Sequence, residues 1–167
     1  MGGRRRRRRW VAVMVGMSVL LGAALAWLLW PSPPPRARVY SERSACLLTD
    51  EQGVAGAKTA PVWAGMQEAS AATRAKVQFL AVVGPQTEQN ALPYLTSLAL
   101  RHCDVVLAVG PAQVAAVAAG ARRFPAVRFV VIGDGVQGAN VLQVASPQRD
   151  ETRLAVKTAV IPLVGGR

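Results

Sequence analysis

The sequence is poor in the side chains that most enzymes use for catalysis. Its 167 residues include one histidine, two cysteines and nine acidic residues, and aromatic residues make up 5% of the chain. One histidine and two separated cysteines cannot supply a metal cluster, and the carboxylates form no paired arrangement. His102 immediately precedes a predicted strand and is expected to lie at the surface. We therefore expect no enzyme activity, no metal and no cofactor.

Acidic residues are also few compared with the 20 Lys and Arg residues, which gives a net charge of +11. The excess is local, because Arg4 to Arg9 are consecutive and residues 31–167 carry 14 basic and 9 acidic side chains. An arginine run can bind nucleic acid. However, the balance of +5 in the remainder is that of an ordinary, mildly basic surface, so we expect no nucleic-acid partner.

The run from Trp10 to Trp30, WVAVMVGMSVLLGAALAWLLW, has no charge and no proline. About 20 apolar residues suffice for a helix to cross a bilayer, and a positive flank stays on the cytoplasmic side. Residues 1–9 are therefore expected in the cytoplasm, residues 10–30 as a single-pass anchor in the cell membrane, and the rest outside. A cleaved signal peptide is the competing interpretation, because Ala24-Leu25-Ala26 resembles a cleavage site. It predicts a secreted protein.

The part after the apolar run divides into a linker, a lobe and a tail. Residues 31–43 begin with a proline-rich stretch, PSPPPRAR, which is typical of a stiff, solvated spacer. Residues 44–160 alternate between strand-like and helix-like segments. The last residues, 161–167, show no periodicity and are expected to form a flexible tail.

The lobe has the pattern of an α/β fold. Short, nearly continuous apolar runs suit the strands of a parallel sheet that is covered on both faces. The expected strands are Ala45–Thr49, Val77–Val83, Asp104–Val109, Val127–Ile132 and Asn140–Val144. The expected helices are Ala60–Arg74, Asn90–His102, Pro111–Arg122 and Gln148–Val160. This alternation predicts a single doubly wound, Rossmann-like parallel sheet. Asn90 is expected to cap its helix, which would place Pro93 in the first turn.

The turn after the first strand lacks a phosphate-binding motif. Thr49 to Gly56 reads TDEQGVAG, which is neither G-x-G-x-x-G nor a P-loop. Asp50 and Glu51 would also place two negative charges where a phosphate should lie. We therefore do not expect this turn to bind a nucleotide phosphate.

Four segments resemble the basic membrane protein family, the purine-nucleoside-receptor-like substrate-binding proteins of ABC transporters. They are Leu48-Thr49-Asp50, the WAGMQEA stretch at 63–69, CDVVLAVG at 103–110 and FPAVRFVVIGD at 124–134. The resemblance covers the N-terminal lobe of that family only, from about Ala45 to Val144. It implies a lobe of the type I periplasmic-binding-protein fold.

The resemblance implies capture of a nucleoside or another small polar solute by an extracytoplasmic, membrane-anchored protein. The chain departs from the family, however, because Ala55–Thr59 replaces a loop with acidic and aromatic ligand contacts, and the second lobe is absent. A homodimer, a companion chain with the second lobe or a transporter partner is then needed to complete the site. The alternative is an interaction or structural module that kept the fold and lost the pocket.

The candidate ligand-binding residues follow the expected strands, since open α/β sheets bind ligands at the carboxyl ends of their strands. They are Asp50, Gly53, Gly110 and Asp134. Each has a structural interpretation as well. Asp50 suits a loop-capping carboxylate, Gly110 and Gly133 suit close-packed turns, and Asp134-Gly135 is a turn signal.

Cys46 and Cys103 are candidates for a disulfide. In lobes of this type the first and third strands are parallel neighbours, so both cysteines are expected near the amino edge of the sheet. In an oxidising exterior, a disulfide there would stabilise the lobe by roughly 2–4 kcal/mol. Two buried free thiols that pack as small apolar groups are the equally weighted alternative.

Overall fold

The structure is a computed structural model that describes residues 39–133, 135–145 and 148–165, together with Met14, Met17 and Leu20. The chain divides into two units, Met1–Ala37 and Arg38–Arg167, and the second unit is the α/β lobe. The predicted cytoplasmic segment 1–9, most of the predicted anchor 10–30 and most of the linker 31–43 lie outside the described residues. Within the described part of the chain, no helix is both long and apolar enough to cross a bilayer.

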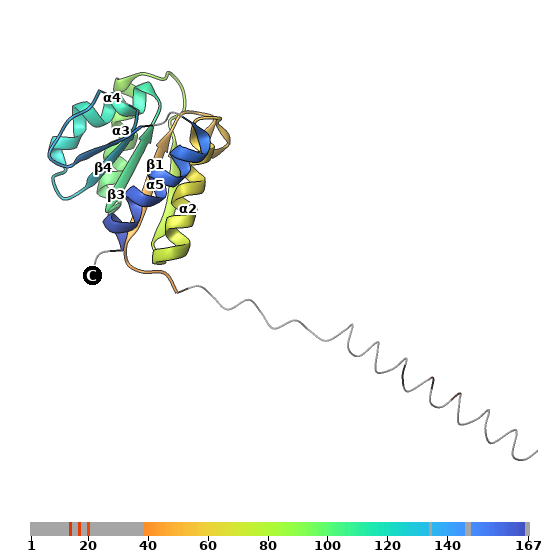
Figure 1. Ribbon diagram of the computed structural model, residues 1–167. Helices are drawn as coiled ribbons and strands as arrows, with labels where there is room; N and C mark the ends of the chain where they lie inside the picture. Colours follow the sequence, from red (N-terminus) through yellow and green to blue (C-terminus); the bar gives the residue numbers. More distant parts are fainter. Residues whose placement is uncertain are drawn as a thin grey trace, which may run out of the picture. The chain divides into compact units, whose positions relative to one another are not determined.

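One five-stranded sheet, parallel throughout, forms the centre of the lobe (Figure 1). Its strands are β1 (Ser44–Thr49), β2 (Lys76–Ala81), β3 (Val105–Val109), β4 (Arg128–Ile132) and β5 (Val141–Val144). The spatial order is β2-β1-β3-β4-β5, so β2 and β5 are the edge strands. The predicted α/β class with a single parallel sheet is confirmed, and every predicted strand is present.

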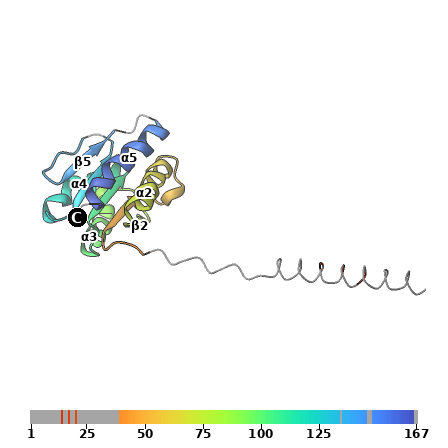
Figure 2. The ribbon, with the colours of Figure 1, turned by 60° about the horizontal axis from the view of Figure 1, so that its bottom comes forward.

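Helices cover both faces of the sheet. They are α2 (Thr59–Thr73), α3 (Glu88–Leu100), α4 (Pro111–Gly120) and α5 (Arg149–Val164), with short 3₁₀ turns at η1 (Gly53–Ala55) and η2 (Ala121–Arg123). In Figure 2, α2 and α5 lie side by side, and the core clusters assign them to one face and α3 and α4 to the other. The described residues between β4 and β5 form a loop rather than a crossover helix.

Strand residues alternate between two apolar cores, as the two-residue period of a strand requires. In β1, Cys46 and Leu48 join the core under α3 and α4, whereas Ala45 and Leu47 join the core under α2 and α5. All residues of β3 are buried for the same reason, since both of its faces are covered. The continuous apolar runs in the sequence are thus explained by a sheet with two packed faces.

The two helices on the second face approach each other closely at Gly65. A Cβ atom at Gly65 would lie 2.5 Å from the carbonyl oxygen of Arg153 on α5. Glu68 of α2 then pairs with two cations of α5, at 3.1 Å from Arg153 Nη1 and 3.0 Å from Lys157 Nζ. The hydrogen bond from Lys157 is the main cause that lowers the pKa of Glu68 below its ordinary value of 4.5.

Two local predictions are wrong. Thr87, not Asn90, caps α3, and its hydroxyl oxygen accepts the N–H of Asn90 at 3.3 Å. The helix therefore begins before Asn90, and Pro93 lies beyond the first turn. The predicted flexible tail 161–167 is also wrong in its first part, because α5 continues through Pro162 to Val164. Val160 and Val164 are buried in the core, and this packing keeps the last turn helical.

Candidate functional site

The carboxyl edge of the sheet contains a cleft at the ends of β3 and β4, next to the point where the chain changes face. From β1 the chain passes to α2 on one face, and from β3 it passes to α4 on the other. Open α/β sheets bind ligands at such a switch point. The cleft has a volume of about 420 Å³ and is lined by Lys58, Val109, Gly110, Pro111, Val114, Ile132 and Gly133.

Two glycines allow the backbone to turn sharply at the cleft. Gly110 has φ +107°, and a Cβ atom there would lie 2.5 Å from Oε1 of Gln113. Gly133 has φ +119°, with open space around the position of a Cβ. Residues other than glycine rarely adopt this backbone conformation. The strands β3 and β4 therefore end in bare backbone at the cleft, which leaves room for a ligand.

Lys58 is the one charged side chain among the described residues that line the cleft. It stands immediately before α2, makes no side-chain capping bond and is exposed. Its ammonium group has three donors and no described acidic partner, so it can contact a polar or anionic group of a ligand. Sequence reasoning missed Lys58 because it falls in a stretch that departs from the family pattern.

The other predicted ligand-binding residues have different positions. Asp50 does not line the cleft, and its Oδ1 accepts the N–H of Gln52 at 3.0 Å, as in a loop-capping turn. Gly53 is buried with φ +60°, and a Cβ there would lie 3.4 Å from the ring of Phe79. Asp134 lies outside the described residues. Of the four residues, Gly110 is the one that the structure places in the cleft.

A buried amide pair supports the same edge of the sheet. Gln113 of α4 is 1% exposed and donates from Nε2 to Oε1 of Gln86 at 2.8 Å. Gln86 in turn donates to the carbonyl oxygens of Val82 and Gly84, at 2.9 and 3.1 Å. The first turn of α4 is thereby tied to the loop after β2. This network fixes the N-terminal end of α4 beside Gly110.

The two cysteines form a disulfide. Cys46 and Cys103 are buried, their Cα atoms are 5.9 Å apart, and the bond closes a sequence separation of 57 residues. It joins β1 to the residue that precedes Asp104 and β3. Nε2 of Gln78 on β2 lies 3.1 Å from Sγ of Cys46. The structure therefore contains the disulfide rather than the two free thiols, which were the alternatives that the sequence left open.

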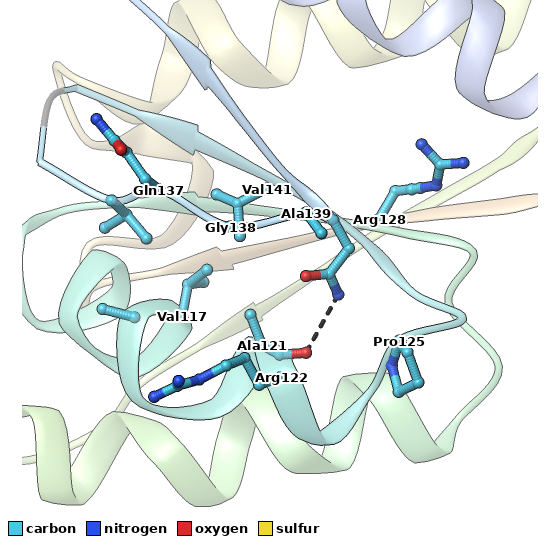
Figure 3. Close-up of a pocket in the computed structure, with 12 residues that line it drawn as sticks. Val117, Ala121, Arg122, Pro125, Arg128, Gln137, Gly138, Ala139 and Val141 are labelled. Atoms are coloured by element: carbon cyan, nitrogen blue, oxygen red, sulfur yellow. Dashed lines mark hydrogen bonds between the residues drawn. The ribbon is translucent and has the colours of Figure 1, made fainter.

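A second and larger hollow, of about 760 Å³, lies beside α4 and β5 (Figure 3). Apolar side chains such as Val117, Ala121 and Val141 line its middle. Arg122 and Arg128 also line it, but Figure 3 shows their guanidinium groups pointing away from the middle and from each other. The two cations therefore do not converge on a common anion. We interpret this groove as an apolar surface with a basic rim.

Asn140 fixes the wall of that groove. Its Nδ2 lies 3.1 Å from the carbonyl oxygens of Ala121 and Phe124 and 3.0 Å from that of Val127. The side chain thus holds the loop before β5 against the connection from α4 to β4. No motif in the sequence indicated this role, because an Asn before a strand is common in turns of many kinds.

Two further features bear on possible chemistry, namely metal-ligand clusters and the histidine. No group of three or more His, Cys, Asp or Glu residues there could hold a metal ion. His102 is exposed at the amino edge of the sheet, where its carbonyl oxygen accepts the hydroxyl of Ser44 at 2.8 Å. The cleft lies at the opposite edge, so His102 cannot reach it.

Comparison with known proteins identifies the fold. No family model and no curated protein matches the chain, so the specific resemblance to basic membrane proteins is not supported. A crystallised fragment of a candidate lipoprotein from Peptoclostridium difficile 630 has a TM-score of 0.59 at 15% identity, over 72% of this chain and 98% of that one.

Solute-binding proteins of ABC transporters are also similar in structure. The protein from Conexibacter woesei DSM 14684 has a TM-score of 0.52 at 22% identity, over 62% of this chain and 35% of that one. The protein from Aeropyrum pernix K1 has a TM-score of 0.50 at 19% identity, over 60% of this chain and 28% of that one. The lobe therefore has a periplasmic-binding-protein-like fold, and it spans about a third of these two transporter proteins.

Proposed function

We propose that this protein is a membrane-anchored, extracytoplasmic lobe that captures a small polar solute, such as a nucleoside, in the carboxyl-edge cleft. The observation that carries the proposal is the position of the cleft at the carboxyl ends of β3 and β4, with Lys58 and the bare backbone of Gly110 and Gly133 at its wall. Its volume of about 420 Å³ is within the range of roughly 300–1,000 Å³ of small-molecule sites.

The site is completed by a second protein surface. Small-molecule sites usually bury about 70–90% of the ligand surface, whereas this cleft is formed by one lobe. A second copy of the chain, a companion chain with the second lobe or a transporter subunit supplies the missing contacts. The ligand is then held between two surfaces, and its affinity depends on the assembly.

The predicted anchor and the disulfide support the proposed location. Six arginines before the apolar run 10–30 favour a cytoplasmic N-terminus, with the lobe outside the cell membrane. A disulfide between Cys46 and Cys103 supports an oxidising compartment. Secretion after cleavage near Ala24-Leu25-Ala26 would place the lobe in the same compartment but free of the membrane.

A protein-interaction module without a ligand is the second candidate function. Two observations favour it: the carboxylate of Asp50 is engaged in its own turn, and one cation is the sole charged group among the described lining residues. In both candidate functions the protein is not an enzyme. The position of His102, the one histidine, at the edge remote from the cleft supports this part of the proposal.

The two candidates are distinguished by titrating the lobe with nucleosides, nucleobases and sugars, with thermal unfolding as the readout. A ligand at a hundred times its Kd stabilises the native state by about 2.7 kcal/mol, which raises the Tm by roughly 10 °C for a lobe of this size. Lys58→Ala should weaken the effect. Lys76→Ala, which removes an exposed cation from β2 at the opposite edge, should not.

Light scattering on the same samples reports whether the ligand-bound form is a dimer. If no compound shifts the Tm of a well-folded sample, the lobe alone does not capture a solute, and the interaction module is the better description. If a compound shifts the Tm of both variants equally, the ligand binds elsewhere than in the cleft.

A further inference from the structure

The two edges of the sheet carry opposite charge. In a parallel sheet, all strands begin at the amino edge, and the crossover helices end there. The cations at this edge are Arg43, Arg74, Lys76, Arg101, Arg122, Arg123 and Arg128, and the described carboxylates are Glu42 and Asp104. Seven cations and two carboxylates give a balance of +5 at the amino edge.

The carboxyl edge, which contains the cleft, has the reverse balance. Among its described residues, the cations are Lys58 and Arg149, and the carboxylates are Asp50, Glu51, Glu88, Asp150 and Glu151. Two cations and five carboxylates give a balance of −3. The lobe is therefore electrically polarised along the direction of its strands, although its overall charge is modest.

The cations of the amino edge are exposed and mostly unpaired. Arg43 forms an ion pair with Asp104 at 3.0 Å. The other six form no ion pair with the described residues, and all of them are exposed. Their charge is therefore available to a partner. A structural role within the lobe does not account for six free cations at one edge.

Apolar and aromatic side chains are exposed beside these cations. Val39 and Tyr40 lead into β1 and are 78% and 45% exposed, and Leu100 at the end of α3 is 67% exposed. Arg101 follows Leu100 directly. A surface that combines cations with a tyrosine and aliphatic side chains is suited to the interface between water and lipid, where tyrosine is enriched.

The chain reaches this edge from the predicted anchor. Eight residues, 31–38, separate Trp30 from Val39, and Val39 to Arg43 lead directly into the start of β1. Even a fully extended proline-rich spacer of this length spans only about 25 Å, at about 3.1 Å per residue. With the predicted anchor in the bilayer, a spacer of this length would keep the amino edge within that distance of the membrane surface.

We propose that the amino edge of the sheet docks on the surface of a membrane that contains anionic phospholipids. The anionic headgroups bind the six unpaired cations, and Tyr40 and Leu100 enter the interfacial region. The cleft at the opposite edge then faces away from the bilayer, towards arriving solutes or partner proteins. The inference rests on the proposed membrane location, but its test does not require the anchor.

The test uses residues 38–167, which form a compact unit with both apolar cores. The probes are vesicles of phosphatidylcholine alone and of phosphatidylcholine mixed with phosphatidylglycerol, with co-sedimentation as the readout. Binding to the anionic vesicles alone is expected. It should fall steeply with added salt, since the Debye length shrinks from about 10 Å at 0.1 M to about 3 Å at 1 M.

Matched charge reversals identify the edge that binds. Arg123→Glu at the amino edge and Arg149→Glu at the carboxyl edge change the net charge equally, and both replace exposed arginines without an ion pair. A cation near an anionic surface contributes about a fivefold factor in affinity, so Arg123→Glu should weaken binding by about 25-fold. Arg149→Glu should leave the affinity within a fewfold of the original.

The proposal is overturned if residues 38–167 do not bind anionic vesicles at low salt, or if Arg123→Glu and Arg149→Glu weaken binding equally. Binding to a soluble polyanion such as heparin, without binding to vesicles, would also overturn it and indicate a nucleic-acid or protein partner. The anchor is tested separately, by carbonate extraction of membranes that contain the full chain. A chain that is extracted, while residues 38–167 still bind vesicles, would contradict the anchor and not the docking surface.

Discussion

Reduction of the Cys46–Cys103 disulfide should lower the stability of the lobe substantially. The bond closes a loop with a sequence separation of 57 residues. The loss of loop-closure entropy in the unfolded chain then corresponds to about 4 kcal/mol at 25 °C. For a lobe of about 130 residues, this is a fall in Tm of roughly 15 °C.

Urea unfolding of the oxidised and reduced lobe measures this difference, because the two forms have the same sequence and differ only in the disulfide. The double variant Cys46→Ala/Cys103→Ala serves as the control, and its unfolding curve should not respond to the reductant. A difference of less than about 1 kcal/mol between the oxidised and reduced lobe would refute the loop-entropy argument. A response of the double variant would show that the reductant acts elsewhere.

Three further predictions concern packing and charge. Gly65→Ala should lower the unfolding free energy in urea, although alanine normally favours a helix, because its Cβ would meet the carbonyl of Arg153 at 2.5 Å; a neutral or stabilising result would contradict the close approach. Asn140→Ala should cost about 1–3 kcal/mol in the same assay, since it removes the donor for three carbonyl groups. The pKa of Glu68 is depressed in the fold, so its carboxylate stabilises the fold above a pH of about 4.5, and this stabilisation is lost when the carboxylate is protonated. Glu68→Gln should therefore reduce the fall in stability that the wild type shows as the pH drops below this value. Equal pH profiles of the two proteins would exclude this role for the pair with Lys157.

The sequence was sufficient to predict the sheet because its strands are nearly continuous apolar runs. Residues 105–109 are all buried, and such a run between glycine and aspartate has few alternatives to a covered parallel strand. The expected pairing of β1 with β3 brings Cys46 and Cys103 to the same edge of the sheet, but the residues alone do not distinguish a disulfide from two free thiols. Helix ends were harder, since Thr87 and Asn90 are both good caps and the choice depends on tertiary packing.

The sequence predicts where the site lies better than it predicts which residues line it. Strand ends indicate the carboxyl edge, and Gly110 follows directly from the end of β3. Lys58 and the groove around Asn140 depend on which segments meet across the edge of the sheet. Asp50 was misleading because a carboxylate after a strand suits a ligand contact and a turn equally well, and the hydrogen bond to Gln52 favours the turn.

The core under α2 and α5 is completed late in synthesis, because α5 is the last element of the chain. Val156, Val160 and Val164 of α5 belong to the core that also contains residues of β1, β3 and α2. During synthesis, α5 leaves the ribosome after all five strands. Until then α2 alone covers this face of the sheet, and the part that α5 covers in the complete lobe is exposed to solvent. An unfinished chain therefore exposes apolar surface, which makes it prone to aggregation before synthesis is complete.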